Sequence, residues 1–136
     1  MRHVFAASSA ARTHSEGGIR TSVGPSGRES TTIDLQPIEP LLTRIEATYH
    51  PDQVWLFGSR ARGDARPGSD WDLFVVVPDD TAESVLHPLV AWRLRREPGI
   101  RADVICCRTS EFLDSRETVN TLAYVVAREG VLVLER

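Results

Sequence analysis

The spacing of apolar residues divides the chain from about residue 33 onward into alternating helices and strands. Apolar side chains recur every three or four positions from Ile38 to Tyr49, which predicts a helix with one buried face that ends before Pro51. Short apolar runs bounded by turn-forming residues predict strands. The other expected elements are strands over 53–57, 71–77, 100–108 and 131–134, and helical segments over 59–64, 81–96 (with a kink or boundary at Pro88) and 117–128. This alternation is typical of an α/β domain.

The first 32 residues differ from the rest. They are rich in Ser, Ala, Gly, Arg and Thr and show no sustained apolar period. Because such a segment buries little apolar surface, we expect a disordered tail over residues 1–32 and one folded domain over 33–136. This segment has few acids and four arginines, a composition that weakly resembles a transit peptide. Its apolar stretch at 4–7 is too short for a secretory signal sequence. We therefore favour a disordered tail over a targeting segment.

Two polar motifs lie at the ends of neighbouring predicted strands. Gly58 and Ser59 directly follow an apolar run, and a backbone without Cβ, a hydroxyl and the N–H groups of a helix start can hold phosphate oxygens. Asp70 and Asp72 are two residues apart on the next strand, so their side chains point to the same face. Carboxylates together with substrate phosphates are the usual ligands of Mg²⁺. Singly, each motif is more often an ordinary turn or a solvated strand end; together they indicate nucleotide chemistry with a divalent metal.

These residues resemble a known pattern, that of the nucleotidyltransferases related to DNA polymerase β. Those proteins carry a Gly-Ser turn, then an acid–hydrophobic–acid triplet, then a third acid on a later strand. Gly58-Ser59, Asp70-Trp71-Asp72 and Asp103 match this pattern, and the resemblance covers roughly residues 34–136. Within the superfamily the chain looks similar to the small stand-alone members called minimal nucleotidyltransferases. The similarity lies in the sequence of residues 58–63, Gly-Ser-Arg-Ala-Arg-Gly, and in the C-terminal segment 127–135. The resemblance implies a small mixed sheet with helices packed mainly on one face.

The same resemblance implies roles for the three acids. Asp70 and Asp72 would bind the Mg²⁺ ion that grips the nucleoside triphosphate, and all three acids, including Asp103, would hold a second ion. Asp103 would also help to deprotonate the acceptor hydroxyl. Read from its local sequence alone, Asp103 could equally be an edge-strand residue that faces water. Nucleotidyl transfer is mostly positioning and charge neutralisation, so no covalent enzyme intermediate is required.

Other residues near the Gly-Ser turn are expected to contact the nucleotide. The resemblance implies that Arg62 contacts phosphate together with Gly58 and Ser59. Arg60 and Arg66 are expected to be solvent-exposed loop residues, which is more common for arginine. Ser69 immediately precedes the first acid and is expected to steady the metal-binding loop.

The implied activity is the Mg²⁺-dependent transfer of a nucleoside monophosphate, AMP from ATP, onto a hydroxyl with release of pyrophosphate. Small members of this group often act as antitoxins beside an all-helical HEPN ribonuclease toxin, and some silence it by adding AMP to a tyrosine. A protein acceptor suits this chain, because no further domain remains to bind a separate acceptor. Two alternatives stay open: an aminoglycoside-type nucleotidyltransferase, which carries an additional helical domain, and a non-catalytic module that neutralises its partner by docking alone. A pure binder has no evident need for a costly acidic cluster.

Composition and charge limit the classes of protein to which the chain can belong. The longest apolar run, 73–77, is too short to cross a membrane, and a net charge of −3 disfavours a strongly basic nucleic-acid surface. The adjacent Cys106 and Cys107 form neither a disulfide framework nor a C-x-x-C metal pair, which fits a reducing cytoplasm. Trp92 and the arginines that follow it could form a partner surface, although a solvated helix face is the default explanation.

Overall fold

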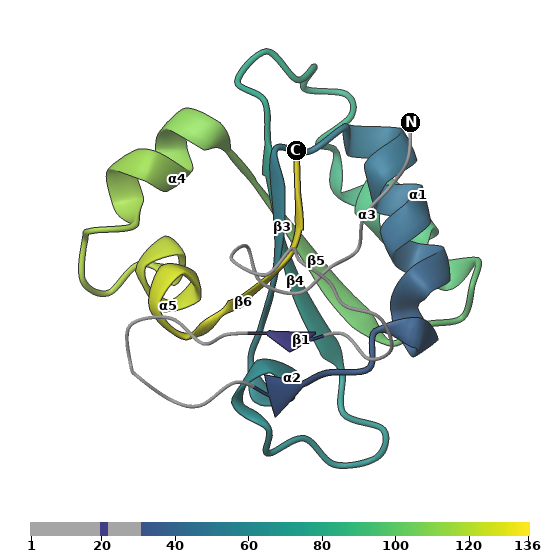
Figure 1. Cartoon of the computed structure of the whole chain (residues 1–136). Helices are drawn as coiled ribbons and strands as arrows, with labels where there is room; N and C mark the ends of the chain where they lie inside the picture. Colours follow the sequence, from purple (N-terminus) through teal and green to yellow (C-terminus); the bar gives the residue numbers. More distant parts are fainter. Residues whose placement is uncertain (1–19, 22–30) are drawn as a thin grey trace.

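A mixed four-stranded sheet with the strand order β5-β4-β3-β6 forms the centre of the structure (Figure 1). The computed structural model describes residues 33–136 and the backbone of 20–21 and 31–32. The strands of the sheet are β3 (Gln53–Phe57), β4 (Trp71–Val77), β5 (Ala102–Arg108) and β6 (Val131–Glu135). β3 lies antiparallel to β4 and β6, whereas β4 and β5 are parallel. The predicted α/β class with a small mixed sheet is confirmed.

A separate pair of short strands precedes the domain. β1 (Arg20–Thr21) and β2 (Thr31–Thr32) run antiparallel to each other. Apart from these four residues, the segment 1–32, for which the sequence predicts disorder, lies outside the described residues.

One face of the sheet packs against helices that come before and after β4. A turn of 3₁₀ helix, η1 (Gln36–Ile38), leads into α1 (Glu39–Tyr49). α1 ends where expected: His50 takes a left-handed conformation and Pro51 follows it. α3 (Pro88–Arg96) packs beside α1 and connects β4 to β5. The boundary predicted at Pro88 is confirmed. His87 caps α3 there by accepting a hydrogen bond from the Leu89 N–H at 3.1 Å.

The opposite face carries α4 (Thr109–Ser115) and α5 (Leu122–Glu129), as Figure 1 shows. Successive residues of β4 point to opposite faces, so Leu73 and Val75 join the core under α1 and α3 while Phe74 joins a smaller core with Phe112 of α4. The helices are therefore divided between the two faces more evenly than the resemblance implied, although the larger core lies under α1 and α3. Over the described residues, no helix is long and apolar enough to cross a membrane.

Candidate active site

β3 ends at a glycine that no other residue could replace without strain. Gly58 has φ 77° and ψ −157°, a conformation that is essentially restricted to glycine, and it begins the four-residue helix α2 (Ser59–Arg62). A Cβ on Gly58 would lie 3.1 Å from Cγ of Asp72 and would overlap its carboxylate oxygen. The cause is the register of the sheet, in which Phe57, the residue before the glycine, lies opposite Asp72 on β4. The Gly-Ser turn and the second acid are therefore in direct contact.

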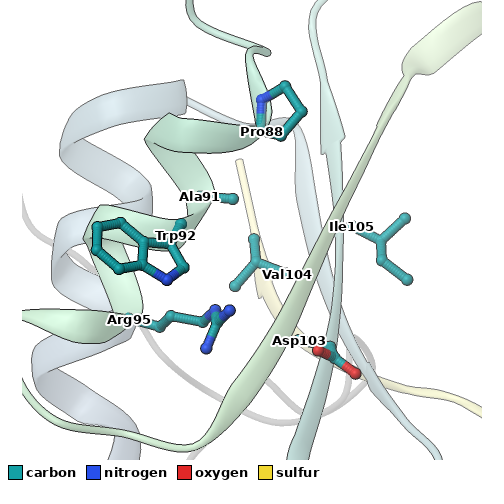
Figure 2. A pocket seen from close by; sticks show the side chains of 7 residues that line it. All are labelled: Pro88, Ala91, Trp92, Arg95, Asp103, Val104 and Ile105. Atoms are coloured by element: carbon teal, nitrogen blue, oxygen red, sulfur yellow. The ribbon is translucent and has the colours of Figure 1, made fainter.

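Asp72 and Asp103 are brought together by the parallel pairing of β4 and β5. The two residues are register partners, so their side chains lie on the same face of the sheet. Burial raises the pKa of Asp72, and the carboxylates of Asp103 and Asp70 raise it further, against the opposing effect of Arg62. Figure 2 shows Asp103 and Ile105 on one side of β5 and Val104 pointing toward α3 on the other. The structure thus places Asp103 and Asp70 each close enough to Asp72 for their charges to raise its pKa.

Asp70 is engaged by an arginine. Its Oδ1 lies 3.3 Å from Nε of Arg101, the residue that precedes β5, and both side chains are substantially exposed. Among the described residues, no group of three or more Asp, Glu, His or Cys side chains is spaced to hold one metal ion. The three-acid ligand set consequently remains a prediction. Asp72 and Asp103 do fit a hard divalent cation, because both offer oxygen ligands on one face and their mutual repulsion calls for a positive charge.

The two arginines of α2 have different surroundings. Arg62 is exposed, pairs with Asp64 at 3.3 Å and contributes positive charge near Asp72. Arg60 is half-buried: its guanidinium lies 4.3 Å from the ring centroid of Trp71 and donates a hydrogen bond to the Ser69 carbonyl at 2.8 Å. Sequence reasoning treated Arg60 as a solvated charge and missed this role. The tryptophan between the two acids was the available signal, because the face of an indole ring attracts a guanidinium.

Ser69 closes the loop that presents the first acid. Its N–H donates to the Arg66 carbonyl and its Oγ accepts from the Arg66 N–H, both at 2.9 Å. This turn and the hydrogen bond from Arg60 fix the chain immediately before Asp70. Ser69 thus takes part in the turn before Asp70, and its Oγ already accepts one hydrogen bond; its contact with the nucleotide stays a prediction. The Ser59 hydroxyl, in contrast, makes no hydrogen bond with another described residue and stays a candidate for phosphate.

A groove of about 330 Å³ opens beside Asp103, between α3 and the outer edge of β5 (Figure 2). It is lined by Pro88, Ala91, Trp92, Arg95, Asp103, Val104 and Ile105. Sequence reasoning noted Trp92 and its neighbouring arginines only as a possible partner surface. Their position beside Asp103 depends on how α3 packs against β5, which no local pattern reveals.

The chain matches a known family over the region that contains these residues. The model of the nucleotidyltransferase domain family matches residues 38–125, which is more than half of the chain, so the protein belongs to this family. The match includes Gly58, Asp70, Asp72 and Asp103. The class expected from the Gly-Ser turn and the acids is confirmed.

Solved structures show a similar fold. The crystal structure of a candidate nucleotidyltransferase from Sulfolobus solfataricus is 21% identical, with a TM-score of 0.52 over 75% of this chain and 80% of that one. A structure described as a toxin-antitoxin with AMP-PNP is 18% identical, with a TM-score of 0.49 over 71% of this chain and 72% of that one. The first likeness supports the fold alone, and we draw nothing from the second. No curated protein matches the chain.

Proposed function

We propose that this nucleotidyltransferase domain moves a nucleoside monophosphate, AMP from ATP, onto a hydroxyl of a protein acceptor with the help of Mg²⁺. The observation that carries the proposal is the contact between Gly58 and Asp72 combined with the register of Asp72 and Asp103. A glycine turn that can approach phosphate adjoins two carboxylates on one face, within the region that matches the family.

The strand order suggests how the residues divide the work. Asp72 on β4 lies between the Gly-Ser turn after β3 and Asp103 on β5. In nucleotidyl transfer the attacking oxygen and the leaving group lie roughly in line on either side of phosphorus. We therefore assign the triphosphate tail to the flank of Gly58, Ser59 and Arg62, and the acceptor hydroxyl to the flank of Asp103.

The proposed reaction is a single displacement. The acceptor oxygen forms a bond to the α-phosphorus, the bond to the bridging oxygen breaks, and pyrophosphate leaves. Asp103 accepts the proton of the attacking hydroxyl. Asp72 and Asp103, joined by Asp70, would hold the cation. Bound Mg²⁺ would supply positive charge to the attacking and leaving oxygens. Asp70 must exchange its pairing with Arg101 for the cation before it can act as a ligand.

We further propose that the acceptor is a HEPN-type toxin and that this protein is its antitoxin. This step is supported by the resemblance of residues 58–63 and 127–135 to minimal nucleotidyltransferases, some of which add AMP to a tyrosine of their toxin. A HEPN protein encoded next to this chain would strengthen the proposal, whereas an isolated resistance cassette would favour an aminoglycoside as the acceptor.

Labelled ATP, Mg²⁺ and the neighbouring toxin test the proposal. We expect label on a toxin tyrosine, and we expect Asp72→Asn and Asp103→Asn each to lower the rate by about 100-fold or more. Asp80→Asn is the matched control, because Asp80 is exposed and follows the end of β4 opposite to the end that carries Asp72. Transfer that persists in both acid variants would contradict the assigned roles.

One observation favours a second function, neutralisation by docking alone. Asp70 is paired with Arg101, and the described residues contain no preformed three-acid site. In that case the toxin would be inhibited equally by the wild type, Asp72→Asn and Asp103→Asn, without any transfer of label.

A further inference from the structure

We propose that the groove between α3 and the edge of β5 is the acceptor subsite, and that it receives a tyrosine from a partner segment with a carboxylate beside that tyrosine. The inference rests on the proposed function and specifies the acceptor of the same site. Asp103 provides the link, because it lies beside Asp72 on the same face of the sheet and also lines the groove. The groove therefore opens on the flank of the acids that lies away from Gly58, where the in-line requirement places the attacking oxygen.

The lining of the groove suits an aromatic ring. Trp92 and Ile105 are large apolar side chains that are 41% and 38% exposed, and Val104 and Ala91 also line the groove. The volume, about 330 Å³, is near the lower end of the range of about 300–1,000 Å³ that is typical of ligand pockets. This space suits one aromatic side chain better than a multi-ring drug, which argues against an aminoglycoside acceptor.

The shape of the groove favours a long side chain. In Figure 2, Trp92, Arg95 and Val104 lie on the α3 side of β5, whereas the carboxylate of Asp103 lies on the other side. An acceptor that docks against α3 must therefore reach around the edge of the strand. A tyrosine carries its hydroxyl at the far end of a rigid ring, while a serine hydroxyl remains next to its own backbone. Tyrosine is thus the hydroxyl residue that bridges the two sides of the strand.

The charge at the groove indicates an acidic neighbour for that tyrosine. Arg95 lines the groove, and no carboxylate of the described residues forms an ion pair with it. Arg96, in the same turn, stacks on Trp92 with its guanidinium carbon 4.8 Å from the ring centroid, which adds positive charge and holds the indole. On a chain with a net charge of −3, this positive region offers complementarity to a carboxylate of the partner.

Peptide binding tests the subsite independently of catalysis. The probe is a synthetic peptide in which a phenylalanine, which cannot be modified, is flanked by glutamates and replaces the tyrosine. We expect it to bind the wild type, and we expect Arg95→Glu to weaken binding about five- to tenfold, since the pair becomes repulsive. Arg95→Gln should have a smaller effect. Arg93→Glu is the matched control, because Arg93 lies on the same helix, is exposed and does not line the groove.

Two further comparisons sharpen the test. Replacing the glutamates of the peptide by lysines should reverse the order of affinity between wild type and Arg95→Glu. With the tyrosine peptide, Trp92→Ala should raise the KM for the peptide but leave the KM for ATP unchanged, and a serine peptide should be a poor acceptor.

The outcomes separate this inference from the proposed function. If the phenylalanine peptide does not bind, or binds the wild type and Arg95→Glu equally, the acceptor subsite is overturned even where transfer to another acceptor occurs. If it binds as expected but no nucleotide is transferred to the tyrosine peptide or to the toxin, the groove stands as a recognition site and the proposed catalysis fails.

Discussion

Asp72 lies directly opposite Asp103 on the parallel strands β4 and β5, with both carboxylates on the same face of the sheet. Burial, then the charge of Asp103, then that of Asp70, raise the pKa of Asp72 above its usual value. Like charges in this register destabilise the folded state. A cation bound between the two carboxylates would offset their repulsion. For this reason we interpret Asp72 and Asp103 as a metal site and not as a structural pair.

Stability without metal should depend on pH through this pair. A carboxyl whose pKa is raised by folding favours the folded state most below the pKa of the unfolded chain, and the advantage is lost as the pH rises through the folded pKa. Asp103→Asn should therefore be more stable than the wild type at pH 7, by less than about 1 kcal/mol because both side chains are partly exposed. The difference should shrink toward pH 3. Urea denaturation in chelator at both pH values measures it, and equal stabilities at pH 7 would show that the two charges do not interact.

Replacing Gly58 should damage both fold and activity. Gly58→Ala combines backbone strain with overlap of the new Cβ and the Asp72 carboxylate, so we expect a loss of about 3 kcal/mol or more in the free energy of unfolding. Displacement of Asp72 should lower nucleotidyl transfer about 100-fold. Gly68→Ala is the control: φ there is also positive, but nothing lies within 4 Å of a Cβ, so only the backbone cost of about 1–2 kcal/mol applies. Similar losses in the two variants would contradict the contact.

Arg60 should act as a support for the acid-bearing loop. Arg60→Ala removes the stacking on Trp71 and the hydrogen bond to the Ser69 carbonyl, for a loss of about 1–2 kcal/mol. Arg60→Lys should not restore it fully, because an ammonium lacks the planar group that stacks and donates at once. Thermal or urea denaturation measures the change. Arg66→Ala, at an exposed loop position, should be nearly neutral.

The smaller core should depend on Phe112. This side chain is 1% exposed and its ring centroid lies 5.7 Å from that of Phe74 and 6.1 Å from that of Trp55. Phe112→Ala should lower the free energy of unfolding by about 3–5 kcal/mol. The neighbouring Leu113 is 54% exposed, so Leu113→Ala should change it by about 0.5 kcal/mol or less. Comparable effects at the two positions would show that α4 is not anchored by Phe112.

The strands that carry the site were predictable, because their signals are local. β3 and β4 have the predicted bounds, since each is a buried run that ends at a glycine or a proline. The two-residue spacing of Asp70 and Asp72 predicts a common face, but β4 begins at Trp71, so Asp70 lies just before the strand and the shared face stays a prediction. α4 was not predicted, since it is a short helix with one buried residue and therefore shows no apolar period.

The features that depend on distant contacts could not be predicted. Arg60 meets Trp71 only after the intervening loop folds back, and Arg101 meets Asp70 only after β5 pairs beside β4. The groove requires α3 and β5 to be placed side by side. Sequence spacing specifies which way a side chain points along its own element, but it does not specify what another element brings to it.

The position of the label in ATP tests the central claim most directly. The toxin, or the glutamate-flanked tyrosine peptide, is incubated with Mg²⁺ and ATP labelled either at the α- or at the γ-phosphate, with wild type and Asp72→Asn in parallel. The account predicts label on the acceptor from the α-phosphate only, one pyrophosphate released for each transfer, and loss of both in Asp72→Asn. Transfer of the γ-phosphate, or equal α-label with Asp72→Asn, would contradict it.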